Sequence, residues 1–151
     1  MTGVFIDTNI FLRHLTGDHP THSPAARGLL EAIERGDIAA WTTETVITEI
    51  VWTLSGSTYH QTPAQIVSLL APLLSIAGLH VPRKRLYARV FDLYATTGID
   101  FVDAYHAALV EHRGQRDLWS FDTDFDRVTG LHRLDPLVDL PTVSVQGSPG
   151  A

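Results

Sequence analysis

Apolar residues occur along this chain in two kinds of run. Short runs, rich in β-branched and aromatic side chains and bounded by polar residues or glycine, are typical of buried strands. We expect such strands at residues 4–6, 38–41, 79–81, 117–121 and 131–134. Between them, apolar side chains recur with the spacing of a helix face, and the clearest set is Val46, Ile47, Ile50, Val51 and Leu54. The pattern therefore predicts strands that alternate with helices.

Capping residues, prolines and glycines set the expected helix ends. Ser23 and Pro24 are typical of a helix start, with Ser as the N-cap and Pro in the first turn. Pro72 is expected to kink or split the helix that contains it. Helices are expected at residues 10–15, from 24 up to Gly36, after a cap at Thr42 or Thr43 up to Gly56, from 63 up to Gly78, at 82–97 and at 101–113.

Strands alternating with helices predict an α/β fold, in which a parallel five-stranded sheet is covered on both faces and the crossovers are right-handed. A chain of 151 residues is expected to form one domain. We assign that domain to residues 1–140. Residues 141–151 are rich in Pro, Ser, Gly and Val and are expected to form a loose C-terminal tail.

Composition narrows the possible functions. There is no cysteine, so disulfides and thiolate zinc sites are excluded. No apolar stretch is long enough for a membrane span and no secretory leader is recognisable, so we expect a cytoplasmic protein without a membrane partner. The net charge of −6, from 17 acidic and 11 basic residues, argues against general coating of nucleic acid. Three of the bases begin the helix expected at 82–97, where they oppose the helix dipole and face either an anion or solvent.

Five acidic residues lie in otherwise apolar surroundings. Asp7 directly follows the first expected strand, and Asp122 and Asp124 follow the fourth. Glu49 and Asp103 lie on helices whose other positions are mostly apolar. Parallel α/β sheets bind ligands beyond the carboxyl ends of their strands, and a buried carboxylate without a partner is costly. Converging acids would be stable around divalent cations, and oxygen ligands select Mg²⁺ or Mn²⁺.

Each acid also has a purely structural interpretation. Asp7 and Asp122 can cap the helices that follow them. Glu49 can extend from a helix flank into water, and Asp103 can close a capping box with Asp100, three residues earlier. These interpretations are reasonable one at a time, but they do not explain why four acids lie at strand ends and on apolar helices together.

At these residues the chain resembles the PIN-domain ribonucleases, and among them the VapC-type toxins of prokaryotic toxin–antitoxin pairs. The resemblance extends from residue 4 to about residue 134 and rests on residues 5–9 (FIDTN), the helix around Glu49, Asp103 with the following Ala104, and residues 120–125 (SFDTDF). Carried over by position, the family's acidic quartet is Asp7, Glu49, Asp103 and Asp122, with Asp124 as a more variable fifth acid. The small polar positions that orient the acids or water are Thr8, Asn9 and Ser120.

The resemblance implies a PIN-like three-layer α/β/α fold and metal-dependent endoribonuclease activity with Mg²⁺, or Mn²⁺, as the cofactor. Asp7, Asp103, Asp122 and Asp124 would be metal ligands, and Glu49 would be a ligand through water or the general base. The implied partners are an RNA substrate, a cognate antitoxin protein and a second copy of the chain in a homodimer.

Other classes of function would use some of the same residues or other residues of the N-terminal part. A calcium-binding EF-hand would use Asp122, Asp124 and Asp126, but Arg127 and Arg133 stand where its Gly and Glu are needed. A phosphatase with Asp7 as nucleophile would need an acid where Asn9 stands, and a phosphorylated receiver would need a late lysine, whereas the only lysine is Lys84. A transition-metal site from His14, His19 and His22 would lie on a surface loop. The remaining alternative is a degenerate PIN domain that only binds RNA or protein.

Overall fold

Strands and helices alternate from one end of the chain to the other in the computed structural model, which describes residues 2–141. The α-helices are α1 (Thr8–Thr16), α2 (His22–Glu34), α3 (Glu44–Ser55), α4 (Pro63–Leu74), α5 (Tyr87–Thr97) and α6 (Phe101–His112). The strands are β1 (Val4–Phe5), β2 (Ala40–Trp41), β3 (Leu79–His80), β4 (Asp117–Trp119) and β5 (His132–Leu134). Two 3₁₀ helices, η1 (Lys84–Leu86) and η2 (Thr123–Arg127), complete the set. The predicted α/β class is confirmed.

Strand pairing differs from the prediction in one respect. All pairs are parallel, as expected, but they form a three-stranded sheet in the order β1-β2-β3 and a separate two-stranded sheet of β4 and β5. A single central five-stranded sheet is therefore not shown, and the prediction is corrected to two sheets. The strands are two or three residues long, so each makes few ladder bonds. At the outer edge of the first sheet, Val4 and Phe5 are 51% and 46% exposed.

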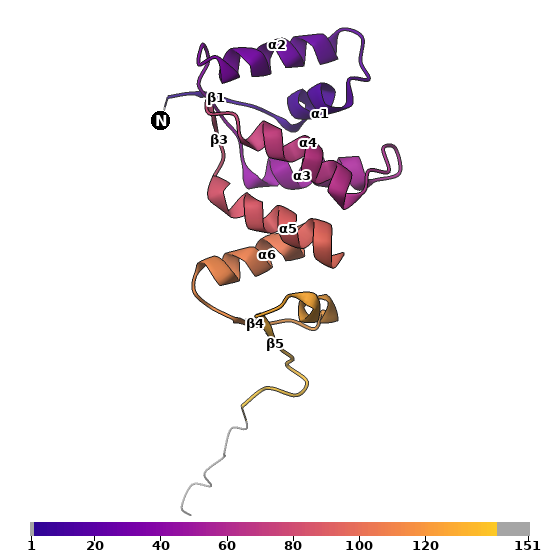
Figure 1. The fold of residues 1–151 in the computed structure, drawn as a ribbon, viewed down its shortest axis with the longest axis vertical. Helices are drawn as coiled ribbons and strands as arrows, with labels where there is room; N and C mark the ends of the chain where they lie inside the picture. Colours follow the sequence, from indigo (N-terminus) through magenta and orange to yellow (C-terminus); the bar gives the residue numbers. More distant parts are fainter. Residues whose placement is uncertain (1, 142–151) are drawn as a thin grey trace, which may run out of the picture.

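Figure 1 shows how the elements are arranged around these sheets. They are spread along the long axis, with α2 and α1 at one end and β4 and β5 at the other. Helices α3, α4, α5 and α6 occupy the middle of the molecule. The helices that carry the candidate site residues, α1, α3 and α6, thus lie at different levels along this axis.

Most helix ends follow the predicted capping signals, but α1 begins at Thr8 and not at residue 10, α4 ends at Leu74 and not just before Gly78, and three further details differ. Helix α2 begins at His22 and not after Ser23, because the Ser23 hydroxyl accepts a hydrogen bond from the His19 backbone N–H and is not an N-cap. Helix α4 continues through Pro72 to Leu74 without being split. The helix predicted for 82–97 begins only after Arg83, which adopts a left-handed φ of 51°, and its first turn is the 3₁₀ helix η1, which α5 follows directly.

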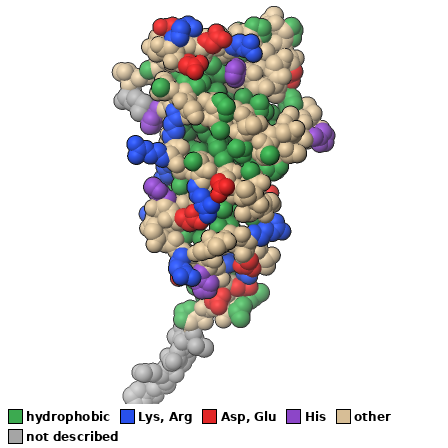
Figure 2. All heavy atoms as spheres, viewed as in Figure 1, with side chains coloured by type: hydrophobic (Ala, Val, Ile, Leu, Met, Phe, Trp, Pro, Cys, Tyr) green, Lys and Arg blue, Asp and Glu red, His purple; other side chains and the backbone are tan. Residues whose placement is uncertain are grey.

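Apolar packing between the helices forms the core. All five positions predicted for the apolar side of α3 are buried, so that prediction is confirmed. Helix α4 adds Ile66, Leu70, Leu73 and Leu74. In Figure 2 the hydrophobic side chains gather over the middle of the visible face, with charged side chains of both signs above and below them.

Two further expectations concern the chain ends and membranes. The tail predicted for residues 141–151 lies, except for its first residue, outside the described part of the chain. Within residues 2–141, no helix has both the length and the apolar character needed to cross a bilayer.

Candidate metal centre

Three carboxylates from two segments come together at one end of α6. One oxygen each from Asp103, Asp122 and Asp124 lies within 4.8 Å of the others. Asp103 is in the first turn of α6, Asp122 follows β4, and Asp124 lies in η2. Asp103 and Asp124 are half-buried and Asp122 is exposed. We call these three residues the acid group.

Local hydrogen bonds explain the position of the two acids that follow β4. Asp122 is the N-cap of η2, and its Oδ1 accepts from the backbone N–H of Asp124 at 2.8 Å. The Ser120 hydroxyl oxygen accepts from the backbone N–H of Asp122 at 3.0 Å. Arg127 lies one helical turn further on, with its guanidinium 3.3 Å from a carboxylate oxygen of Asp124. The predicted cap role of Asp122 is therefore real, and it places this carboxylate beside Asp103.

Helix α6 presents Asp103 without the local bond that the structural interpretation requires. Asp100 occupies the N-cap position, but its side chain makes no capping hydrogen bond. The pKa of Asp103 is raised above its usual value, first by burial and then by the negative charges of Asp122, Asp100 and Asp124, while His106 acts in the opposite direction. A raised pKa means that the ionised form of Asp103 is destabilised where it stands. A bound cation would remove that destabilisation.

The chemistry of the donors fits a hard divalent cation. The three side chains offer only carboxylate oxygens, which suit Mg²⁺ and Mn²⁺ better than softer metals. Mg²⁺ commonly keeps several water molecules and takes one or two carboxylates, and the exposure of Asp122 leaves the group accessible to water. The acid group can therefore hold the cation that the sequence predicts.

The other two acids of the expected quartet, Asp7 and Glu49, are not among the three residues of the acid group. The Thr8 hydroxyl donates to Glu49 Oε2 at 2.6 Å, joining α1 to α3. Asp7 is the N-cap of α1, yet its side chain makes no capping hydrogen bond, so the capping interpretation does not explain it. Asp7 and Glu49 are exposed and lie outside the acid group. The expected burial of the acids is thus corrected, because three of the five are exposed.

Two of the three small polar residues each contact one of the acids. Thr8, which is buried, fixes Glu49, and Ser120 fixes Asp122. Asn9 is exposed and lines a groove between α1 and α2. The structure thus gives an orienting contact for Thr8 and Ser120. For Asn9, the role implied by the resemblance remains a prediction.

Asp100 and His106 act on the acid group although the sequence analysis did not place them in the site. Asp100 was interpreted only as a helix cap, and His106 was not considered. Both lie three residues from Asp103, one on each side. Residues three apart on a helix are neighbours, so this spacing is the signal by which they could have been found.

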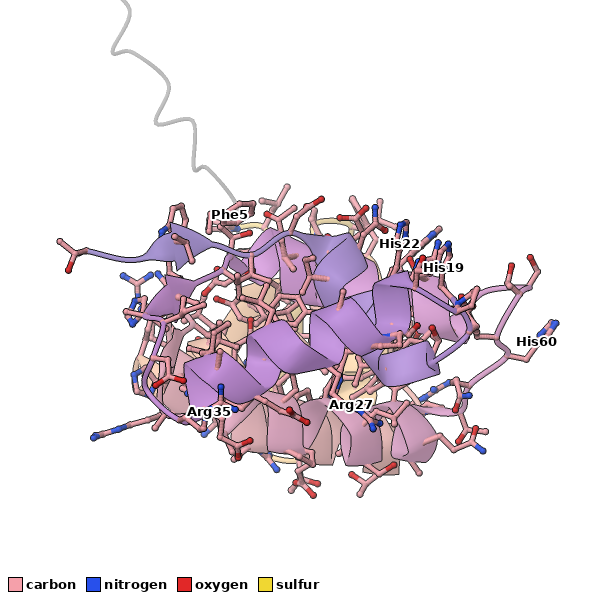
Figure 3. The ribbon with its side chains drawn as sticks, turned by 90° about the horizontal axis from the view of Figure 1, so that it is seen from above. Phe5, His19, His22, Arg27, Arg35 and His60 are labelled. Carbon is pink, nitrogen blue, oxygen red and sulfur yellow. The ribbon has the colours of Figure 1, made fainter. Side chains whose placement is uncertain are left out.

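The structure also bears on the alternative sites. His19 Nδ1 accepts from the backbone N–H of His22 at 3.0 Å, and the two rings stack with centroids 3.8 Å apart, as Figure 3 shows. These contacts engage His19 with its own loop, and within the described residues the acid group is the one set with metal-ligand spacing. For the calcium loop, Asp126 is paired with Arg133 at 3.0 Å and does not join the acid group.

The basic residues at the start of the 82–97 segment are also engaged within the chain. Arg83 is 2.9 Å from Glu44, and the Lys84 ammonium donates to the carbonyl oxygens of Ile76 and Leu79. These contacts favour the interpretation without a bound anion for these two residues.

A family model described as the PIN domain matches residues 4–131. A search of curated proteins finds no match to the chain. The matched range contains every residue of the acid group together with Asp7, Thr8 and Glu49.

Proposed function

The chain belongs to the PIN domain family, and from that premise we propose that it is a metal-dependent endoribonuclease that acts as the toxin of a toxin–antitoxin pair. Membership of the family supports nuclease activity in general. The observation that carries the proposal to this chain is the acid group, in which three carboxylate oxygens lie within 4.8 Å of one another. Like charges at this separation repel, and the arrangement is suited to a divalent cation.

We assign the metal to Asp103, Asp122 and Asp124, with Asp7 as a further ligand on the strength of the resemblance. A divalent cation at this position would supply positive charge to the phosphodiester and would acidify a water molecule. Arg127, beside Asp124, is placed to hold a phosphate oxygen of the substrate.

Glu49 is the residue we assign to proton transfer. The hydrogen bond from Thr8 engages Oε2 and leaves Oε1 to accept a proton from the attacking water. The water oxygen bonds to phosphorus and the bond from phosphorus to the 3′ oxygen breaks, so that the 3′ oxygen takes up a proton. The products are a 5′-phosphate and a 3′-hydroxyl.

The toxin role is supported by the resemblance and by the chemistry of the site. An antitoxin can silence an acidic site by inserting an Arg or Lys side chain, whose charge replaces that of the metal. We also propose that the protein works in the cytoplasm, where its RNA substrate is found, and that it forms a homodimer. A protein that remains monomeric in sedimentation at micromolar concentration would contradict the homodimer.

Cleavage with analysis of the product ends tests the nuclease. Purified protein should cut RNA in Mg²⁺ or Mn²⁺, stop in EDTA, and leave ends that a 5′-phosphate-dependent exonuclease degrades. Cleavage that leaves 2′,3′-cyclic phosphate ends would overturn the proposed chemistry. Saturable metal binding without any cleavage would support instead the degenerate domain that only binds RNA or protein.

A further inference from the structure

A cavity opens beside the acid group between α3, α4 and the start of α6. Its volume is about 480 Å³, which is within the range of small-ligand sites. Asp103 of the acid group is one of the residues that line it. Figure 1 shows α3 and α4 side by side in the middle of the molecule, with α5 between them and α6.

Trp52 is the unusual residue of this cavity. It lines the space and is 79% exposed, so its flat ring is accessible to a ligand. It lies three residues after Glu49 on α3, so the two are neighbours on the helix surface. A flat, exposed aromatic ring beside a phosphodiester-cleaving site is suited to stacking on an unpaired base.

The charge of the lining identifies which part of a nucleotide fits. Asp100 and Asp103 line the cavity, and within the described residues no Lys, Arg or His does. A phosphate would be repelled there, whereas a base that carries an amino group can donate to a carboxylate. Asp100 is the available acceptor, because it is exposed and makes no capping hydrogen bond, while Asp103 is assigned to the metal.

We propose that this cavity binds one unpaired nucleobase of the RNA, stacked on Trp52 and donating an amino hydrogen to Asp100, in the nucleotide next to the cleaved phosphodiester. The inference rests on the nuclease function proposed above. Adenine, cytosine and guanine carry an exocyclic amino group, whereas the donor that uracil offers on its pairing edge is its ring N3–H. The cavity therefore gives the enzyme a preference against uracil at one position.

Cleavage kinetics test the stacking. Trp52→Ala should lower kcat/KM on single-stranded RNA about 5- to 100-fold, the range expected from loss of one stacked base. Trp52→Phe keeps an aromatic ring and should retain most of the activity. Leu137→Ala is the matched control, because Leu137 is 84% exposed and does not line the cavity; it should leave kcat/KM unchanged.

Substrates that lack one base locate the contact. With the wild type, removing the base next to the cut should lower kcat/KM at least as much as Trp52→Ala does. With Trp52→Ala the same removal should cost less than it costs the wild type, because only the bond to Asp100 is left to lose. Independent losses that multiply would overturn the proposal. Asp100→Asn should reduce the preference against uracil, because an amide can both donate and accept; an unchanged preference would overturn the role of Asp100.

Binding without cleavage separates this inference from the nuclease proposal. Tryptophan fluorescence is measured while oligoadenylate, oligocytidylate, oligoguanylate or oligouridylate is added to wild type and Trp52→Phe. The wild type should be quenched by the first three more than by the last, and Trp52→Phe should lose that quenching. Quenching in a protein that cuts nothing would retain the base cavity and reject the nuclease. Cleavage without quenching of Trp52 would retain the nuclease and reject the base cavity. A Trp52→Ala protein that changes from dimer to monomer would show that the cavity is an interface between copies, and this result would also reject the base cavity.

Discussion

Replacing Asp103 with Asn should stabilise the protein in the absence of metal. Two unit charges 4.8 Å apart repel by about 0.9 kcal/mol in a water-like dielectric and by about 3.5 kcal/mol at an effective dielectric of about 20. The lower repulsion energy, about 0.9 kcal/mol per pair of charges, applies here, because Asp122 is exposed and Arg127 partly neutralises Asp124. Asp103 also gains about 0.3–1 kcal/mol from its place in the first turn of α6. Asp122 and Asp124 together repel Asp103 by about 1.7 kcal/mol at this lower energy per pair, so the net gain of Asp103→Asn is about 0.7–1.4 kcal/mol.

The pH dependence of this gain follows from the raised pKa of Asp103. A folded-state pKa above the unfolded value of about 3.9 means that the folded chain binds the proton more tightly. Wild-type stability therefore falls as the pH rises through the unfolded and then the folded pKa. Asp103→Asn should match the wild type below about pH 3.5 and exceed it at neutral pH, with its melting temperature higher by about 2–4 °C.

Mg²⁺ should reverse the order of the two proteins. A ligand at a hundred times its Kd stabilises the folded state by about 2.7 kcal/mol, and this gain belongs to the protein with the intact acid group. Melting curves in EDTA and in Mg²⁺ measure both effects. Asp126→Asn is the matched control, because Asp126 is paired with Arg133 and lies outside the acid group; it should lose stability and still respond to Mg²⁺. The reasoning is refuted if Asp103→Asn is less stable in EDTA and Mg²⁺ shifts neither the wild type nor this variant.

Three further outcomes are expected. Thr8→Val removes the donor to Glu49 and should cost about 1–3 kcal/mol in urea unfolding and lower the cleavage rate; a rate equal to that of the wild type would mean that Glu49 needs no orienting bond. Gly78→Ala should destabilise by about 1–3 kcal/mol because its Cβ would overlap with the carbonyl oxygen of Ile33, whereas Gly28→Ala, at an open helical position, should stabilise by about 0.5–1 kcal/mol; equal effects of these two changes would contradict the packing of α2 against β3. Expression of the chain alone should arrest growth, and coexpression of the upstream neighbouring gene should relieve the arrest; harmless overexpression of folded, active protein would count against the toxin role.

The sequence was most informative where a residue's role depends on its own segment. The helical period predicted which side of α3 is buried, and the glycines and capping residues predicted most helix ends. Asp122 and Asp124 could be placed together, because the turn after β4 is set by bonds within residues 120–124. Asp103 belongs to the same group in the structure.

Features that depend on contacts between segments far apart in the sequence could not be predicted as well. The apolar runs identify strands but do not encode their order, so the division into two sheets could not be predicted. For the same reason the sequence could not place Asp7 and Glu49 relative to the acid group, because their position depends on how β1 and α3 pack. The start of the helical segment after residue 83 depends on the left-handed φ of Arg83, a conformation that an arginine rarely adopts and that no spacing rule indicates.

The metal dependence of RNA cleavage in Asp122→Asn and Asp126→Asn tests the central claim most directly. The two residues lie four apart in the same segment and receive the same substitution, but only Asp122 belongs to the acid group. The wild type and Asp126→Asn should cut RNA with rates that saturate in Mg²⁺ and vanish in EDTA. Asp122→Asn should remain folded and lose cleavage about 100-fold or more, the size of effect seen when a group that stabilises developing charge is removed. Cleavage by Asp122→Asn at the wild-type rate, or by the wild type in EDTA, would show that the acid group is not the catalytic metal centre.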